Sequence, residues 1–176
     1  MIKLGEKVIK YGHYPDGTLN IKLTQNDINS LISYSHIGWY YDSEEELVVM
    51  IYLLNALHSK NITGIGLDMP YVPNARMDRC ENVNDVFTLK YFANIINSLG
   101  FNFVRTLDVH STVTEALINN ISNESPVSYI QFVMGQIVPF TNRELTIFYP
   151  DVGSMKRYSK MIKAPCAFGN KVRDWE

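Results

Sequence analysis

Four short polar segments carry residues that could bind phosphate or a metal ion. The first holds Arg76 and Arg79 around Asp78, and the forked N–H donors of arginine match the oxygens of a phosphate group. A surface loop in which Asp78 pairs with an arginine would explain the same residues, because exposed ion pairs are common. Taken alone, this segment favours the ion pair over the phosphate site.

The second segment places a carboxylate and an imidazole two residues apart, at Asp108 and His110. Such a pair could coordinate a divalent metal that carries a nucleotide phosphate. Asp108 is the more ordinary ligand of the two, because Mg²⁺ prefers oxygen. A structural histidine or a helix cap explains His110 equally well, so the spacing alone leaves both explanations open.

The last two segments are a Pro-Asp-Val-Gly-Ser turn at 150–154 and the pair Lys171 and Arg173. Small residues in the turn would let a ligand approach the backbone near Asp151, although a helix capped by Asp151 is a credible alternative. Lys-x-Arg pairs are frequent on protein surfaces. The sequence contains neither a Gly-x-x-x-x-Gly-Lys-[Ser/Thr] loop nor Gly-x-Gly-x-x-Gly, so neither a P-loop kinase nor a dinucleotide-binding Rossmann domain is supported.

These segments follow predicted strands. Hydrophobic patterning predicts strands at 62–67, 101–107, 145–149 and 166–168, and helices at 47–57, 86–99, 112–119 and 154–162. Glu44, Glu45 and Glu46 suit the first turn of a helix, and Thr112 with Glu115 predicts a capping box. The fold class is therefore α/β, with a mostly parallel sheet flanked by helices, in which ligands bind beyond the carboxyl ends of the strands.

An N-terminal β-hairpin is predicted from alternating apolar residues around 8–11 and 19–23, joined by a Pro-Asp-Gly turn at 15–17. The stretch 122–142 shows no clear pattern and could contain a domain junction.

The composition is that of a globular protein, with 46% hydrophobic and 19% charged residues among 176. A net charge of -2 makes a large nucleic-acid interface improbable. We expect no membrane span, because the most apolar stretch, 47–57, reaches about half of the ~20 residues required. Cys80 and Cys166 lack a metal-binding spacing, and no export signal is visible, so the sequence predicts a cytoplasmic protein.

Taken in order, the segments resemble the ribose-phosphate diphosphokinase (PRPP synthetase) family. Its members carry Ala-Arg-Gln-Asp-Arg, Asp-Leu-His, Pro-Asp-x-Gly-Gly and Lys-x-Arg, and a hairpin tip with Phe-Ser-Asp-Gly-Glu. The similar segments here lie at 75–79, 108–110, 150–154, 171–173 and 14–18. The resemblance covers essentially the whole chain. It implies a phosphoribosyltransferase-like domain at 1–140 and the incomplete start of a second one at 141–176.

The resemblance implies Mg²⁺-dependent transfer of diphosphate from ATP to ribose 5-phosphate, giving PRPP and AMP. In the family the hairpin tip serves the adenine site of a neighbouring subunit, which implies a homo-oligomer. The implied roles are nucleotide binding by Tyr14, Asp16, Arg76, Asp78 and Arg79, metal binding by His110 and Asp151, and catalysis by Lys171 and Arg173.

The sequence also departs from the family pattern. Met77, Thr18 and Ser154 replace a glutamine, a glutamate and a glycine, which affects the expected nucleotide selectivity. No Thr-Gly-Gly-Thr-like ribose-phosphate loop occurs in these 176 residues, so we expect a fragment or a natural short form that is inactive alone.

Two alternatives follow from that absence. A non-catalytic subunit that associates with an active synthetase would not need the loop, but would not need Arg76, His110, Lys171 and Arg173 either. A plain phosphoribosyltransferase would need the loop and ranks last.

Overall fold

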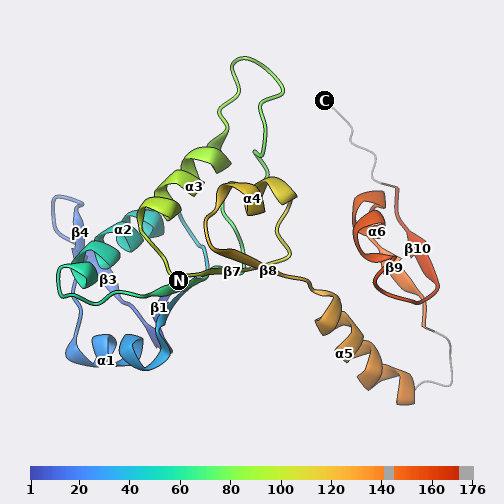
Figure 1. The fold of residues 1–176 in the computed structure, drawn as a ribbon, viewed down its shortest axis with the longest axis horizontal. Coiled ribbons are helices and arrows are strands. Elements are labelled where there is room, and N and C mark those ends of the chain that lie inside the picture. Colours follow the sequence, from blue (N-terminus) through green and yellow to red (C-terminus); the bar gives the residue numbers. More distant parts are fainter. Residues whose placement is uncertain (141–144, 171–176) are drawn as a thin grey trace. The chain divides into compact units, whose positions relative to one another are not determined.

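The computed structural model describes residues 1–140 and 145–170, and the chain divides into two compact units (Figure 1). Unit 1 is Met1–Glu124 and unit 2 is Ser125–Glu176. The domain boundary expected at 140–141 stays a prediction. None of the helices in the described part of the chain is long and apolar enough to cross a membrane.

Unit 1 alternates strands and helices after two N-terminal hairpins. Its elements are β1 (Ile2–Leu4), β2 (Lys7–Val8), β3 (Tyr11–His13), β4 (Leu19–Ile21), α1 (Gln25–Tyr34), β5 (His36–Trp39), α2 (Glu45–His58), β6 (Gly66–Asp68), α3 (Thr88–Ser98), β7 (Val104–Leu107), α4 (Thr112–Leu117) and β8 (Ile121–Glu124).

Six strands form one sheet in the order β2-β1-β5-β6-β7-β8. The four strands β5 to β8 are parallel, whereas β1 runs antiparallel to β5 and β2 antiparallel to β1. The sheet is thus mostly parallel and flanked by helices, which confirms the predicted fold class. The parallel strands bring their carboxyl ends to one edge, where the loops that follow β6 and β7 begin.

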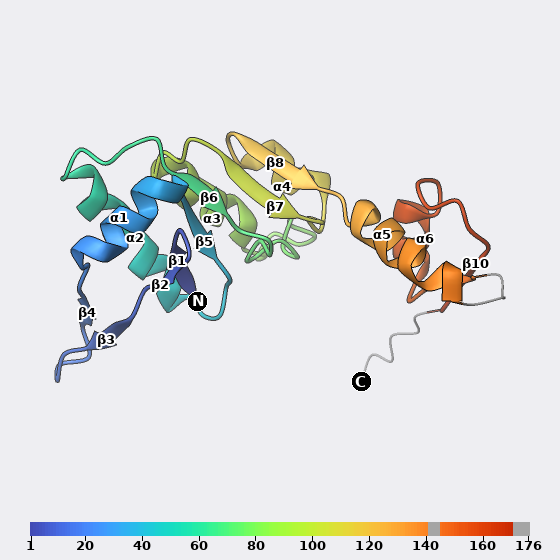
Figure 2. The ribbon, with the colours of Figure 1, turned by 90° about the horizontal axis from the view of Figure 1, so that it is seen from below.

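The core lies between the sheet and the helices α2 and α3. Figures 1 and 2 show α2, α3 and α4 on one face of the sheet and α1 on the other. Alternate strand residues reach the α2 face because side chains along a strand alternate between faces. The buried side chains there include Ile2, Leu4, Ile37, Trp39 and Leu67 from the strands, Val49, Met50, Leu53 and Leu57 from α2, and Leu89, Phe92 and Ile96 from α3.

The opposite face carries a polar cluster that sequence patterning does not reveal. Arg105 on β7 donates to Asp68 on β6 through Nε at 2.7 Å and Nη2 at 3.1 Å. His36 on β5 lies 3.3 Å from the same carboxylate, and Phe103 packs under the Arg105 guanidinium. The three strands therefore share one polar network across this face.

The N-terminal β-hairpin is confirmed, with narrower bounds. Strand β3 pairs with β4 in the register Tyr11 to Ile21, around a tip that contains the predicted Pro-Asp-Gly turn. Val8 belongs instead to β2, which forms a separate hairpin with β1 through Gly5, a residue with φ +57°. Val8 is absent from β3 because it pairs with β1 instead.

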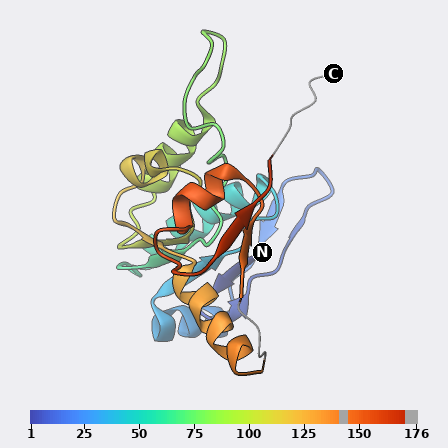
Figure 3. The ribbon, with the colours of Figure 1, turned by 90° about the vertical axis from the view of Figure 1, so that its right-hand side faces the viewer.

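Unit 2 contains α5 (Val127–Ile137), a 3₁₀ turn η1 (Val138–Phe140), β9 (Ile147–Tyr149), α6 (Val152–Tyr158) and β10 (Cys166–Phe168). Figure 3 shows β9 and β10 side by side with α6 against them, and the two strands are parallel. This is the βαβ unit expected from the sequence. Helix α6 begins two residues before the predicted start, because Asp151 caps it.

Candidate functional site

Two polar loops leave the sheet side by side, after β6 and after β7. The backbone N–H of Leu107, the last residue of β7, donates to the carbonyl of Pro70 at 3.2 Å. Pro70 begins the segment that leads to Arg76 and Arg79, and Leu107 is followed directly by Asp108. The first two sequence segments therefore start at neighbouring points on the carboxyl edge of the sheet.

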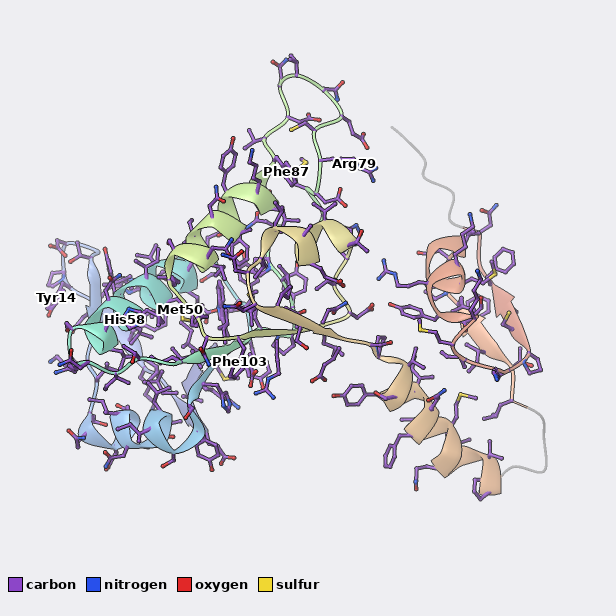
Figure 4. All side chains as sticks on the ribbon, viewed as in Figure 1. Tyr14, Met50, His58, Arg79, Phe87 and Phe103 are labelled. Carbon is purple, nitrogen blue, oxygen red and sulfur yellow. The ribbon has the colours of Figure 1, made fainter. Side chains whose placement is uncertain are left out.

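The arginine loop presents its cations to solvent. Arg76 and Arg79 are both exposed, and Figure 4 shows Arg79 pointing away from the loop. The Nε of Arg79 lies 3.4 Å from Oδ1 of Asp78, so the ion pair expected as an alternative is present. Because Arg79 is 74% exposed, this pair contributes little to stability and leaves the guanidinium accessible. Both arginines are thus accessible from solvent.

The turn after β7 is held by the edge strand β8. Asp108 has φ +52°, a conformation uncommon outside glycine, and its N–H donates to the carbonyl of Glu124 at 2.9 Å. The N–H of Val109 donates to the side-chain oxygen of Asn123 at 3.2 Å. His110 follows on the exposed side of this turn. The backbone that carries Asp108 and His110 thus has a defined shape.

The predicted capping box at Thr112 and Glu115 is wrong. Helix α4 has Ser111 at its N-cap, and within the described residues the Ser111 hydroxyl has no hydrogen-bond partner. The carboxylate of Glu115 instead accepts from the side-chain amide of Asn123 at 2.7 Å. The reason is tertiary: a donor on β8 lies within reach of Glu115 and takes the place of the local cap.

A second cluster on the same edge was not predicted. Tyr41, after β5, and Tyr71, after β6, have ring centroids 5.9 Å apart. Glu44 accepts from the Tyr41 hydroxyl at 3.3 Å and from Asn74 at 3.5 Å. Burial raises the pKa of Tyr41, and the nearby Glu44 carboxylate raises it further. Both tyrosines are visible in the sequence, but their contact depends on β5 and β6 being neighbours in the sheet.

The hairpin tip is shaped by Asp16. Its Oδ1 accepts from the Thr18 N–H at 3.0 Å and from the Thr18 hydroxyl at 2.7 Å. The hydrogen bond from the Thr18 backbone N–H has the largest effect on the pKa of Asp16 and lowers it. The bond from the Thr18 hydroxyl lowers it further, so this carboxylate stays charged. Figure 4 shows Tyr14 on this tip, far from Arg79 within unit 1. The structure therefore does not bring the tip to the arginine loop of the same chain.

In unit 2, the structure shows the helix cap that was the alternative explanation for Asp151. Asp151 is the N-cap of α6, and its Oδ1 accepts from the Ser154 N–H at 2.7 Å and from the Ser154 hydroxyl at 3.0 Å. The cap does not exclude a ligand role, since a carboxylate has about four lone-pair sites. Lys171 and Arg173 lie outside the described residues.

Residues 1–140 and 145–170 contain no cluster of three or more His, Cys, Asp or Glu side chains that could hold a metal ion. The predicted ligands His110 and Asp151 belong to different units. Mg²⁺ needs few protein ligands where it is bound through nucleotide phosphates, because one or two carboxylates and water complete its shell. The donor set around Asp108 and His110 fits a phosphate-borne metal rather than a protein cage.

Comparison with known proteins finds ribose-phosphate pyrophosphokinases as relatives. A curated ribose-phosphate pyrophosphokinase 1 from Listeria monocytogenes is 26% identical over 179 residues, covering 98% of this chain and 54% of the relative. A ribose-phosphate pyrophosphokinase from Clostridium tetani is 30% identical over 173 residues, covering 92% and 52%. These relatives support the assignment of the chain to the ribose-phosphate pyrophosphokinase family. No family model matches the sequence.

The fold of the chain matches a solved structure as well. The crystal structure of phosphoribosylpyrophosphate synthetase from Mycobacterium smegmatis gives a TM-score of 0.71 at 14% identity, covering 95% of this chain and 57% of that one. The likeness shows a shared fold. The chain spans about half the length of the curated relatives it matches.

Proposed function

We propose that this chain provides the nucleotide-binding half of a ribose-phosphate pyrophosphokinase, which transfers diphosphate from ATP to ribose 5-phosphate and yields PRPP and AMP. The observation that carries the proposal is the adjacency of the arginine loop and the Asp108 turn, joined by the Leu107 to Pro70 hydrogen bond. Phosphoryl groups gain negative charge during transfer, so cations aimed at them dominate catalysis.

The individual roles follow from residue chemistry. Arg76 and Arg79 bind ATP phosphates, and Asp78, which lies beside Arg79, belongs to the same nucleotide-binding loop. The turn with Asp108 and His110 meets the phosphates and their Mg²⁺, a metal that supplies positive charge to the transferred group.

The remaining predicted residues carry further roles in the reaction. Asp151 serves the ribose hydroxyls and a second Mg²⁺, while Lys171 and Arg173 stabilise the transferred diphosphate. Tyr14 and Asp16 hold adenine from a neighbouring subunit, which requires a homo-oligomer, because the tip is far from Arg79 in one chain. We place this ATP-dependent reaction in the cytoplasm.

The 176-residue chain by itself is proposed to bind nucleotide but to turn over little. No Thr-Gly-Gly-Thr-like loop for ribose 5-phosphate occurs in these residues, and positioning of the acceptor supplies much of the rate of such a reaction.

The test is calorimetric titration of the chain with ATP, with and without Mg²⁺. We expect Mg²⁺-dependent binding, weakened about tenfold to hundredfold in Arg76→Ala, because charge-assisted hydrogen bonds to phosphate are lost. Lys60→Ala removes an exposed cation beyond the end of α2 and should bind like the wild type. Absence of Mg²⁺-dependent binding by the folded chain would refute the proposal.

A further inference from the structure

One side chain of the edge strand links three parts of the site. The Oδ1 of Asn123 on β8 accepts from the Val109 N–H at 3.2 Å and lies 3.5 Å from the Thr106 hydroxyl. Its Nδ2 donates to Oε1 of Glu115 on α4 at 2.7 Å. Strand β7, the turn after it and helix α4 therefore meet at a single amide group.

The chemistry of the amide explains why both contacts are made together. An asparagine side chain has an accepting oxygen and a donating nitrogen, whereas an ionised glutamate only accepts. Glu115 can therefore bind only the nitrogen of Asn123, which turns the oxygen toward the N–H of Val109. In this way Glu115 sets the orientation of the amide that holds the turn.

The backbone of this turn adopts an uncommon conformation, which its contacts must maintain. Asp108 adopts φ +52°, which is unfavourable for a residue with a Cβ, and Ser111 makes no side-chain cap among the described residues of α4. Backbone pairing of Asp108 with Glu124 holds one side of the turn. The side chain of Asn123 holds the next residue, Val109, which is 8% exposed.

We propose that Asn123 and Glu115 are positioning residues that fix the backbone between Asp108 and His110 in the geometry that receives nucleotide phosphate. The inference rests on the proposed function for the identity of the ligand. It assigns the control of this turn to β8 and α4, two elements that carry none of the predicted site residues.

The experiment exchanges the donor and the acceptor. Asn123→Asp places a carboxylate against Glu115, so the two oxygens repel and the group that binds the Val109 N–H is displaced. The double variant Asn123→Asp with Glu115→Gln restores a donor and an acceptor, now reversed, at the same net charge as the wild type. Asn102→Asp, an exposed residue of another loop, is the matched control.

Two readouts are taken on the full chain. Amide hydrogen exchange at Val109 should become about tenfold faster in Asn123→Asp, and affinity for Mg²⁺-ATP should fall about tenfold, as expected for one lost hydrogen bond. Both should return toward wild type in the double variant, while Asn102→Asp changes neither. A double variant as impaired as the single one, or unchanged Val109 exchange in Asn123→Asp, would overturn the proposal.

The proposed function and the positioning role of Asn123 and Glu115 can be refuted separately. A wild-type chain that binds no Mg²⁺-ATP would refute the proposed function, whereas the pattern of Val109 exchange across the variants would still decide whether Asn123 and Glu115 position the turn. Normal nucleotide binding in Asn123→Asp with fast Val109 exchange would contradict the link between the turn and the phosphate site.

Discussion

The indole N–H of Trp39 donates a 3.0 Å hydrogen bond to Oε2 of Glu46 inside the core. The same oxygen accepts from the backbone N–H of Asp42 at 2.9 Å, and the amino group of Met1 contacts the other oxygen. Glu46 therefore joins the end of β5 to the first turn of α2, where the Tyr41 and Glu44 cluster begins. The sequence suggested only that this residue suits the helix dipole.

Replacing Glu46 by alanine should destabilise the protein by about 3 kcal/mol, because the buried Trp39 indole N–H, the Asp42 backbone N–H and the Met1 ammonium would lose their acceptor. Urea unfolding, followed by circular dichroism, measures this change. Glu44→Ala removes an exposed carboxylate two positions earlier in the chain and should cost less than about 1 kcal/mol. Equal effects of the two substitutions would contradict the assigned role of Glu46.

Gly66 on β6 should tolerate no side chain while Phe103 is present. A Cβ at Gly66 would lie 2.0 Å from Cζ of the Phe103 ring, so one of the two must shift. We expect Gly66→Ala to cost about 1–3 kcal/mol in unfolding free energy, as overpacking usually does.

A double-mutant cycle identifies the cause of that cost. Adding Phe103→Leu should recover part of the loss, because the ring that clashes is gone. Gly12→Ala is the control, since a Cβ there meets no atom within 4 Å. Additive effects of Gly66→Ala and Phe103→Leu would show that the ring is not responsible.

The start of α1 should make stability depend on pH. The side chain of Asp27 accepts from the Thr24 N–H at 2.8 Å and from the Thr24 hydroxyl at 2.6 Å, and the Thr24 hydroxyl bond is the main cause that lowers the pKa of Asp27 below 3.8. Since the folded pKa is the lower one, the unfolded chain takes up the proton first as pH falls. The stabilisation is therefore present above the unfolded pKa and is lost as pH falls through the folded value.

Thr24→Ala should cost about 1 kcal/mol at neutral pH, because it removes an N-cap. Unfolding free energies measured at about pH 7 and about pH 3 should show that this cost shrinks in acid. Thr112→Ala, at the position where the sequence wrongly predicted a cap, should leave the stability nearly unchanged at both values. A Thr24→Ala cost that does not depend on pH would argue against the role of Asp27.

The separation of Tyr14 from Arg79 predicts complementation between subunits. If the hairpin tip serves a neighbour, mixed assemblies of Asp16→Ala and Arg76→Ala chains should contain intact sites, about a quarter of the total for random association. Titration with Mg²⁺-ATP after the two variants are unfolded and refolded together should recover that fraction of binding. Each variant refolded alone is the control, and no recovery in the mixture would contradict a site shared between subunits.

The elements with strong local patterns were predictable. The helix at 45–58 and the helix at 88–98 follow from their apolar residues, and the strand at 166–168 follows from a short apolar run. Helix α1 was missed although Thr24 and Asp27 form a capping box, because most of its residues are polar. Helix α5 and all but the first residue of strand β8 lie in the stretch 122–142, where Ser, Asn and Pro hide the pattern.

By itself the sequence determined the α/β class, the family resemblance and the presence of arginine, aspartate and histidine at predicted strand ends. Those features depend on local periodicity and on residue chemistry, which a linear string preserves. Only the tertiary structure decided that the loops after β6 and β7 start side by side, that Glu46 is buried against Trp39, and that Asn123 holds Val109. These contacts join residues through strand order and register, which depend on packing of the whole sheet rather than on neighbouring residues.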